Sequence, residues 1–290
     1  MIRDHLVPST LKEALDLKQR LGENALFVAG GTDLFIRMRE KIIFPQYLID
    51  LTKIRGLIIQ EKIEADHLNI GACMTVCQIS KSSLIERHVP SLVTASAQLG
   101  SPAIRNQATI GGNLVNASPA ADLVPPLMAQ GATVHTVSSN GRRSFPLEEL
   151  FTDVNKTILF PDEILTHISV PILQPLEGAV YLKLGLREAL SISVVTVAIW
   201  LKRKGRKVEG VRIALGSVAP RIFRASRAET FLSGKPLTTE MVHQTADMAS
   251  QECQPISDIR ASSEYRKSMV VELVKIGLET VWRSSVTHKG

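Results

Sequence analysis

Cysteine is scarce in this chain of 290 residues, which holds only Cys73, Cys77 and Cys253. A zinc site or an iron–sulfur cluster needs about four ligands, often from paired C-x-x-C segments, and the sequence has no such segment. Two thiols four residues apart do not complete such a site. We therefore expect no metal in this chain, and three reduced, mostly buried thiols typical of a reducing compartment.

Long apolar runs and aromatic residues are also missing. No stretch approaches the roughly 18–20 uninterrupted apolar residues of a membrane span, and the N-terminus has no apolar signal core. Only 4% of the residues are aromatic, so the chain has few platforms for stacking nucleic-acid bases. The formal charge of +6 is spread thinly, and its densest run, residues 202–207, is typical of a solvated hairpin turn at Gly205. These absences predict a cytoplasmic protein with no membrane insertion and no nucleic-acid partner.

The motifs of common catalytic sites do not occur. There is no G-x-G-x-x-G fingerprint, no Walker loop and no H-E-x-x-H zinc motif. The seven histidines are scattered along the chain, and each is better explained as a surface or packed residue than as a ligand. We expect no catalytic side chain and no metal ligand.

Two glycine pairs stand out in what the chain does contain. The first, in VAGGTDLF (28–35), follows an apolar strand, and the second lies in TIGGN (109–113). Adjacent glycines permit positive φ and a close approach to the main chain, and successive N–H groups in such turns form an anion-binding concavity. Two concavities fit a ligand with two consecutive phosphates. A plain turn is the alternative at either position.

The order of elements predicts an α+β architecture. A helix is expected over residues 9–21, capped by Ser9 or Thr10 and ended by Gly22. Three strands with hairpin spacing are expected over residues 179–220, followed by helices over 238–253 and 262–285. Prolines and a glycine place a boundary near residues 174–178. We predict domains at 1–174, with subdomains of about 1–54 and 55–174, and at 178–290.

Several segments carry a family resemblance. AGGTDL and IRNQATIGGNLVNASPAAD closely resemble the two FAD-binding loops of the flavin subunits of the molybdenum hydroxylases. These subunits form the xanthine dehydrogenase and carbon monoxide dehydrogenase medium-subunit family. Further segments are similar to it in the right order: YLIDLTKIRGL, LNIGACMTV, DEILTHISVP, YLKLGLREALSIS, GSVAPRIFRASRAETFLSGKPL and PISDIRASSEYRK. The resemblance implies a PCMH-type FAD-binding domain of two α/β subdomains, followed by an α+β carbon monoxide dehydrogenase flavoprotein C-terminal-like domain.

The resemblance also implies a set of cofactor-binding residues. They are Phe27, Val28, Ala29, Gly30, Gly31, Thr32, Asp33 and Leu34 in the first loop, Thr109, Ile110, Gly111, Gly112 and Asn113 in the second, and Asp122, Leu165 and Lys183 elsewhere. An acid repels phosphate, so Asp33 is expected to accept backbone or ribityl donors. Three of these residues have simpler alternatives: a helix cap for Asp122, a strand core residue for Leu165, and a surface lysine for Lys183.

The activity implied by the resemblance is electron transfer. FAD would receive electrons from iron–sulfur centres and pass them to NAD, a quinone or another acceptor. Neither loop contains histidine, so the FAD is expected to be non-covalent. The implied partners are a [2Fe–2S] small subunit and a molybdopterin large subunit. Two alternatives stay open: a stand-alone PCMH-type flavin oxidoreductase, and a non-enzymatic binding module whose glycine pairs are only turns.

Overall fold

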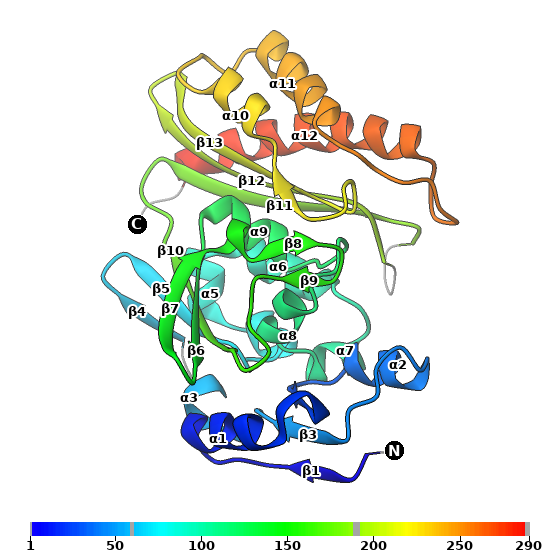
Figure 1. Ribbon diagram of the computed structural model, residues 1–290. Helices are drawn as coiled ribbons and strands as arrows, with labels where there is room; N and C mark the ends of the chain where they lie inside the picture. Colours follow the sequence, from blue (N-terminus) through cyan, green and yellow to red (C-terminus); the bar gives the residue numbers. More distant parts are fainter. Residues whose placement is uncertain (1, 59–60, 188–191, 288–290) are drawn as a thin grey trace.

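The computed structural model describes residues 2–58, 61–187 and 192–287, arranged from the N-terminal sheet at one end to the last two helices at the other (Figure 1). Within these ranges, no helix is both long enough and apolar enough to span a bilayer. The chain combines three large groups of elements, each built on its own sheet.

The first group is a small parallel sheet in the order β1-β3-β2, made of β1 (Asp4–Leu6), β2 (Ala25–Val28) and β3 (Tyr47–Asp50). Helix α1 (Leu11–Leu21) packs on it, and its N-cap Thr10 accepts a hydrogen bond from the Glu13 N–H. A short 3-10 turn η1 (Gly22–Asn24) leads into β2. After β2 come the first glycine pair and the short helix α2 (Leu34–Arg39), and α3 (Arg55–Ile58) follows β3.

The second group is an antiparallel sheet in the order β4-β5-β10-β6-β7. Its strands are β4 (Glu61–Glu64), β5 (His67–Gly71), β6 (Thr133–Ser138), β7 (Gly141–Pro146) and β10 (Ile164–Pro171). Six helices lie between β5 and β6 in the chain: α4 (Val76–Ile79), α5 (Ser83–His88), α6 (Pro90–Gln98), α7 (Pro102–Gln107), α8 (Ile110–Val115) and α9 (Val124–Gln130). The minor elements η2 (Leu147–Glu149), β8 (Phe151–Asp153) and β9 (Lys156–Thr157) follow β7.

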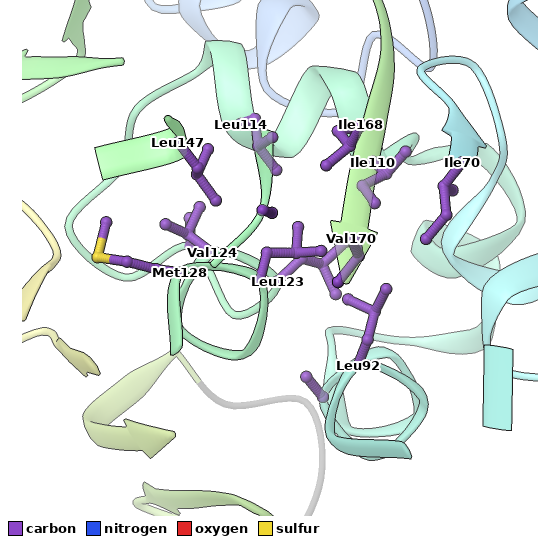
Figure 2. Close-up of a cluster of buried hydrophobic side chains, with 14 of the residues drawn as sticks. Ile70, Leu92, Ile110, Leu114, Leu123, Val124, Met128, Leu147, Ile168 and Val170 are labelled. Atoms are coloured by element: carbon purple, nitrogen blue, oxygen red, sulfur yellow. The ribbon is translucent and has the colours of Figure 1, made fainter. Parts of the chain in front are cut away.

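A large apolar core joins this sheet to its helices. Ile110 of α8 and Val124 of α9 pack in one cluster with Ile168 and Val170 of β10 (Figure 2). Burial of such side chains contributes about 1.5–3 kcal/mol each. Helix α8, which carries the second glycine pair, is therefore fixed to the sheet by its apolar face.

The third group is an antiparallel sheet of β11 (Glu177–Gly185), β12 (Ser193–Lys204), β13 (Lys207–Gly216) and β14 (Phe223–Arg224). Helices α11 (Thr239–Gln251) and α12 (Ser263–Thr287) lie beyond one face, with α10 (Ser226–Leu232) beside β13, and α6 and α9 meet the opposite face (Figure 1). Tyr181, Ala198 and Ala214 of this sheet belong to the same apolar cluster as the second group.

The structure confirms the α+β class and the main predicted elements. The helix expected over 9–21, the three C-terminal strands and the two closing helices are present, and Gly205 forms the tip of the β12–β13 hairpin with a φ of +60°. The domain and subdomain boundaries stay a prediction.

Candidate cofactor site

A cavity of about 490 Å³ lies between the first glycine turn and α8. This volume is within the range of about 300–1,000 Å³ typical of small-molecule and cofactor pockets. Its lining residues from the predicted set are Phe27, Val28, Ala29, Gly30, Gly31, Thr32, Asp33, Leu34, Thr109, Gly112, Asn113 and Asp122. The structure therefore brings both loops and Asp122 to one cavity.

The first glycine turn offers main-chain donors to this cavity. Among the described residues, no acceptor is bonded to the N–H groups of residues 30–33. Gly31 has a φ of +70°, a left-handed conformation that favours glycine. Successive free N–H groups in such a turn form a concavity that suits phosphate oxygens. The positive φ at Gly31 agrees with the expected turn, and phosphate binding by this turn stays a prediction.

Gly30 serves a different purpose, which is close packing. A Cβ atom at this position would lie 1.9 Å from the main-chain oxygen of Gln107, the last residue of α7. Only glycine allows the two backbones to approach so closely. The contact joins the two predicted loops into the wall of a single cavity.

The second glycine pair differs from the first, and the expectation of two equivalent concavities is wrong. Its residues form the first turn of α8, and neither Gly111 nor Gly112 has a positive φ. The N–H groups are already used: that of Gly111 donates to Ala72 O at 2.8 Å, and that of Gly112 to the N-cap hydroxyl of Thr109 at 3.1 Å. The N–H of Ile110 bonds to Met74 O at 3.0 Å. This loop presents a capped helix start to the cavity, without a row of free donors.

Asp122 lines the cavity and accepts three hydrogen bonds. Tyr181 Oη donates to its Oδ1 at 2.9 Å, Ser193 Oγ to the same oxygen at 2.5 Å, and Lys183 Nζ to its Oδ2 at 2.8 Å. Its side chain is only 9% exposed. The helix-cap alternative is wrong, because the N-cap of α9 is Leu123 and no side chain caps that helix.

Lys183 and Leu165 are placed outside the cavity lining. Lys183 is 6% exposed and also donates to Gln98 O at 3.0 Å, so the surface-lysine alternative is wrong. Leu165 lies in β10 and is buried in the apolar core, as its alternative stated. Ile110 and Gly111 also lie behind the lining. None of these four residues lines the cavity.

Sequence reasoning missed part of the lining. The additional residues are Ile36, Arg37, Leu99, Gly100, Ile104, Ala108, Val115, Asn116, Ser118, Ala120, Ala121 and Ile192. One signal was available: Gly100 precedes a proline-started helix and takes a φ of +47°, which marks a turn. Ile104 and Ile192 carry no such signal, since their place at the cavity depends on tertiary contacts.

The cavity lining carries charged side chains of both signs. In the described lining, Arg37 is the one basic side chain, and Asp33 and Asp122 are the acids. Desolvation raises the pKa of the Asp33 carboxyl, while the Thr32 hydrogen bond and the Arg37 charge lower it. Burial, followed by the Asp122 charge, raises the pKa of Tyr181 well above its usual range, so its phenol stays a donor.

Comparison with known proteins identifies the family. Residues 2–173 match the FAD binding domain in molybdopterin dehydrogenase. The chain belongs to this family. Residues 180–281 of this molybdopterin dehydrogenase family member also match the CO dehydrogenase flavoprotein C-terminal domain. The resemblance predicted from the two glycine loops is confirmed, and the chain is an FAD-binding oxidoreductase subunit.

Relatives of this FAD-binding subunit cover nearly its whole length. The carbon monoxide dehydrogenase medium chain of Hydrogenophaga pseudoflava is 30% identical over 96% of both chains. The xanthine dehydrogenase FAD-binding subunit of Escherichia coli O157:H7 is 31% identical over 92% of this chain and 91% of the relative. A solved structure of the Hydrogenophaga pseudoflava carbon monoxide dehydrogenase, which lacks the Mo-pyranopterin moiety, superposes with a TM-score of 0.94, 30% identity and 98% coverage of both chains.

Proposed function

We propose that this chain is the electron-transfer flavoprotein subunit of a molybdenum hydroxylase. It would receive electrons from iron–sulfur centres of a partner and deliver them to NAD or another acceptor. The observation that carries the proposal is the row of N–H groups at residues 30–33 that have no acceptor among the described residues; these residues line a cavity together with Arg37. FAD, when bound, supplies the redox chemistry.

The residues at the cavity fit the parts of FAD. The N–H groups of residues 30–33 would bind diphosphate oxygens, and the Arg37 guanidinium would balance their charge. Thr109, Gly112 and Asn113 would close the opposite side. Asp33 and Asp122 are acceptors, so they would face hydroxyl or N–H donors of the cofactor rather than its phosphates. Ile110, Gly111, Leu165 and Lys183 would act by holding this wall in place.

Attachment of the cofactor would be non-covalent. Histidine, cysteine and tyrosine, which could form a bond to flavin, do not occur in the described lining of the cavity. The test is to precipitate the purified full chain with acid and to measure the flavin in the supernatant and in the pellet. All flavin should be released to the supernatant as FAD, at about one per chain. Flavin that stays with the precipitated protein contradicts non-covalent binding, and a chain that neither carries nor takes up FAD contradicts the site.

The proposed partners follow from the relatives, which are medium chains and FAD-binding subunits of larger enzymes. A [2Fe–2S] small subunit and a molybdopterin large subunit would hold the other redox centres. The test compares the three-subunit complex with and without this chain. Substrate-to-acceptor turnover should require the chain, with NAD and a quinone analogue assayed separately.

One outcome would favour the stand-alone flavin oxidoreductase instead. If the FAD-loaded chain alone oxidises an organic substrate, the electron-transfer role is replaced by that alternative. Unchanged turnover in a complex without the chain also contradicts the role. Chemical reduction of the flavin in the isolated chain serves as the control for an intact cofactor.

A further inference from the structure

Asp122 connects the cavity to a buried polar cluster that we define as Asp122, Tyr181, Lys183 and Ser193. Asp122 precedes α9, Tyr181 and Lys183 lie two residues apart on β11, and Ser193 begins β12. Tyr181 is 2% exposed and Ser193 is fully buried. A carboxylate taken out of water is costly unless donors compensate it, and here three donors do so.

The three donors leave Asp122 with a limited capacity. A carboxylate has about four acceptor positions. Oδ1 accepts from both Tyr181 and Ser193, and Oδ2 accepts from Lys183. One position remains, on Oδ2, in a residue that lines the cavity. Asp122 can therefore take one donor from a ligand, and it repels any phosphate oxygen.

This capacity excludes one part of FAD. The ribityl chain and the ribose carry hydroxyl donors, and the flavin and adenine rings carry N–H donors, whereas the diphosphate carries no donor at neutral pH. A part of the cofactor that bears a hydroxyl or an N–H satisfies the remaining acceptor position of Asp122, and the diphosphate does not.

We propose that Tyr181 and Ser193 are positioning residues of the FAD site: they hold the Asp122 carboxylate so that its Oδ2 accepts a hydroxyl or N–H donor of the cofactor. The inference rests on the proposed function. Neither residue lines the cavity, so both act through Asp122. Lys183 adds a second constraint, because its bond to Gln98 O fixes the segment whose next residues, Leu99 and Gly100, form another part of the wall.

The donors that complete the site come from the C-terminal sheet. Tyr181 and Lys183 belong to β11 and Ser193 to β12, all within the segment that matches the flavoprotein C-terminal domain. The acceptor belongs to the segment that matches the FAD-binding domain. FAD binding by the N-terminal segment therefore depends on side chains of the C-terminal segment.

The test uses the full chain, freed of flavin and titrated with FAD by fluorescence quenching. Tyr181→Phe and Ser193→Ala each remove one donor, and each should raise the Kd about tenfold. The visible circular dichroism of the bound flavin should also change, which a loss of stability alone would not cause. Matched controls are Tyr265→Phe and Ser233→Ala, since both residues are exposed in the same sheet-and-helix group. These controls should keep the wild-type Kd.

A double-variant comparison tests the route through Asp122. Asp122→Asn should weaken binding by itself, and adding Tyr181→Phe to it should change the Kd less than about twofold. A full-sized additional loss, or wild-type affinity and dichroism in both single variants, overturns the positioning role. If Tyr181→Phe melts at the titration temperature, Ser193→Ala carries the test. Failure of the wild-type chain to bind FAD overturns the proposed function as well, so the two failures are distinguishable.

Discussion

At Gly30, the close contact between the two loops requires a residue without a side chain. A Cβ atom there would lie 1.9 Å from Gln107 O, and a main-chain oxygen cannot move aside cheaply. Gly30→Ala should therefore separate the loops and weaken FAD binding by about a hundredfold. Titration of the flavin-free protein measures this.

Gly56→Ala is the matched control for that substitution. Gly56 lies in α3, and a Cβ atom placed on it would have no neighbouring atom within 4 Å. Its replacement should leave FAD affinity unchanged and alter stability by no more than about 1 kcal/mol. Equal affinities of the two variants would contradict the packing role of Gly30.

The three cysteines should differ in reactivity. Burial, with the charge of Asp50, raises the pKa of Cys73 to about 12, and burial raises that of Cys253 to about 12. Both thiols stay protonated and unreactive at pH 8. Cys77 is half-buried. Native protein should react rapidly with one equivalent of a thiol reagent and unfolded protein with three, and rapid labelling of all three would contradict the burial.

A stacked histidine pair predicts how stability depends on pH. His135 and His167 have ring centroids 4.1 Å apart and planes 3° apart. Burial lowers the pKa of both histidines. The charge of His135 lowers the pKa of His167 further. The unfolded chain then binds more protons than the folded chain below the ordinary pKa of about 6.5. The stability that this neutral pair contributes should be complete above about pH 7.5 and should fall as the pH drops from about 7.5 to about 5.5.

The measurement is the melting temperature across that range, in wild type and in His167→Gln. The variant should lose less stability than the wild type, because one of the depressed groups is gone. His243→Gln, on the exposed side of α11, is the control and should follow the wild-type curve. A wild-type curve that is flat across the whole range would refute the assignment.

At the scale of elements, the local structure of the first glycine pair could be predicted from the sequence, whereas that of the second could be predicted only in part. The strand and the turn of the first pair followed from apolar residues and glycines. For the second pair, Thr109 three residues before Gly112 was a visible cap signal. The loss of its free donors was not visible, because the acceptors, Ala72 and Met74, lie more than 30 residues earlier in the chain.

The cap of α8 gives a prediction at this scale. Thr109→Ala removes the hydroxyl that accepts the Gly112 N–H at 3.1 Å, which should cost about 1 kcal/mol of stability. It should also weaken FAD binding, since Thr109 and Gly112 line the cavity. Urea unfolding and FAD titration measure the two effects separately.

Thr238→Ala provides the comparison, because Thr238 caps α11 through the Met241 N–H in the same way. A similar loss of stability is expected there, with unchanged FAD affinity. If both variants bind FAD equally well, α8 contributes nothing to the site beyond its stability.

At the scale of the whole molecule, the order of elements and the family resemblance were available from the sequence, and the assembly of the site was not. Asp122 and Lys183 were expected at the cofactor separately, yet the structure pairs them and adds Tyr181 and Ser193. These contacts join residues about 60–70 positions apart. Periodicity reports which face of a strand is buried, but it does not report what that face meets.

The C-terminal sheet also bears on how the protein can be divided. One face packs under α11 and α12, and the other meets α6 and α9, with Tyr181, Ala198 and Ala214 in the core shared with the FAD-binding segment. Cutting the chain between the two matched families would uncover apolar surface on both pieces. Shuffling this segment between relatives as an interchangeable module would then require redesign of the shared face, because the border between the two matched sequence families crosses a shared apolar core.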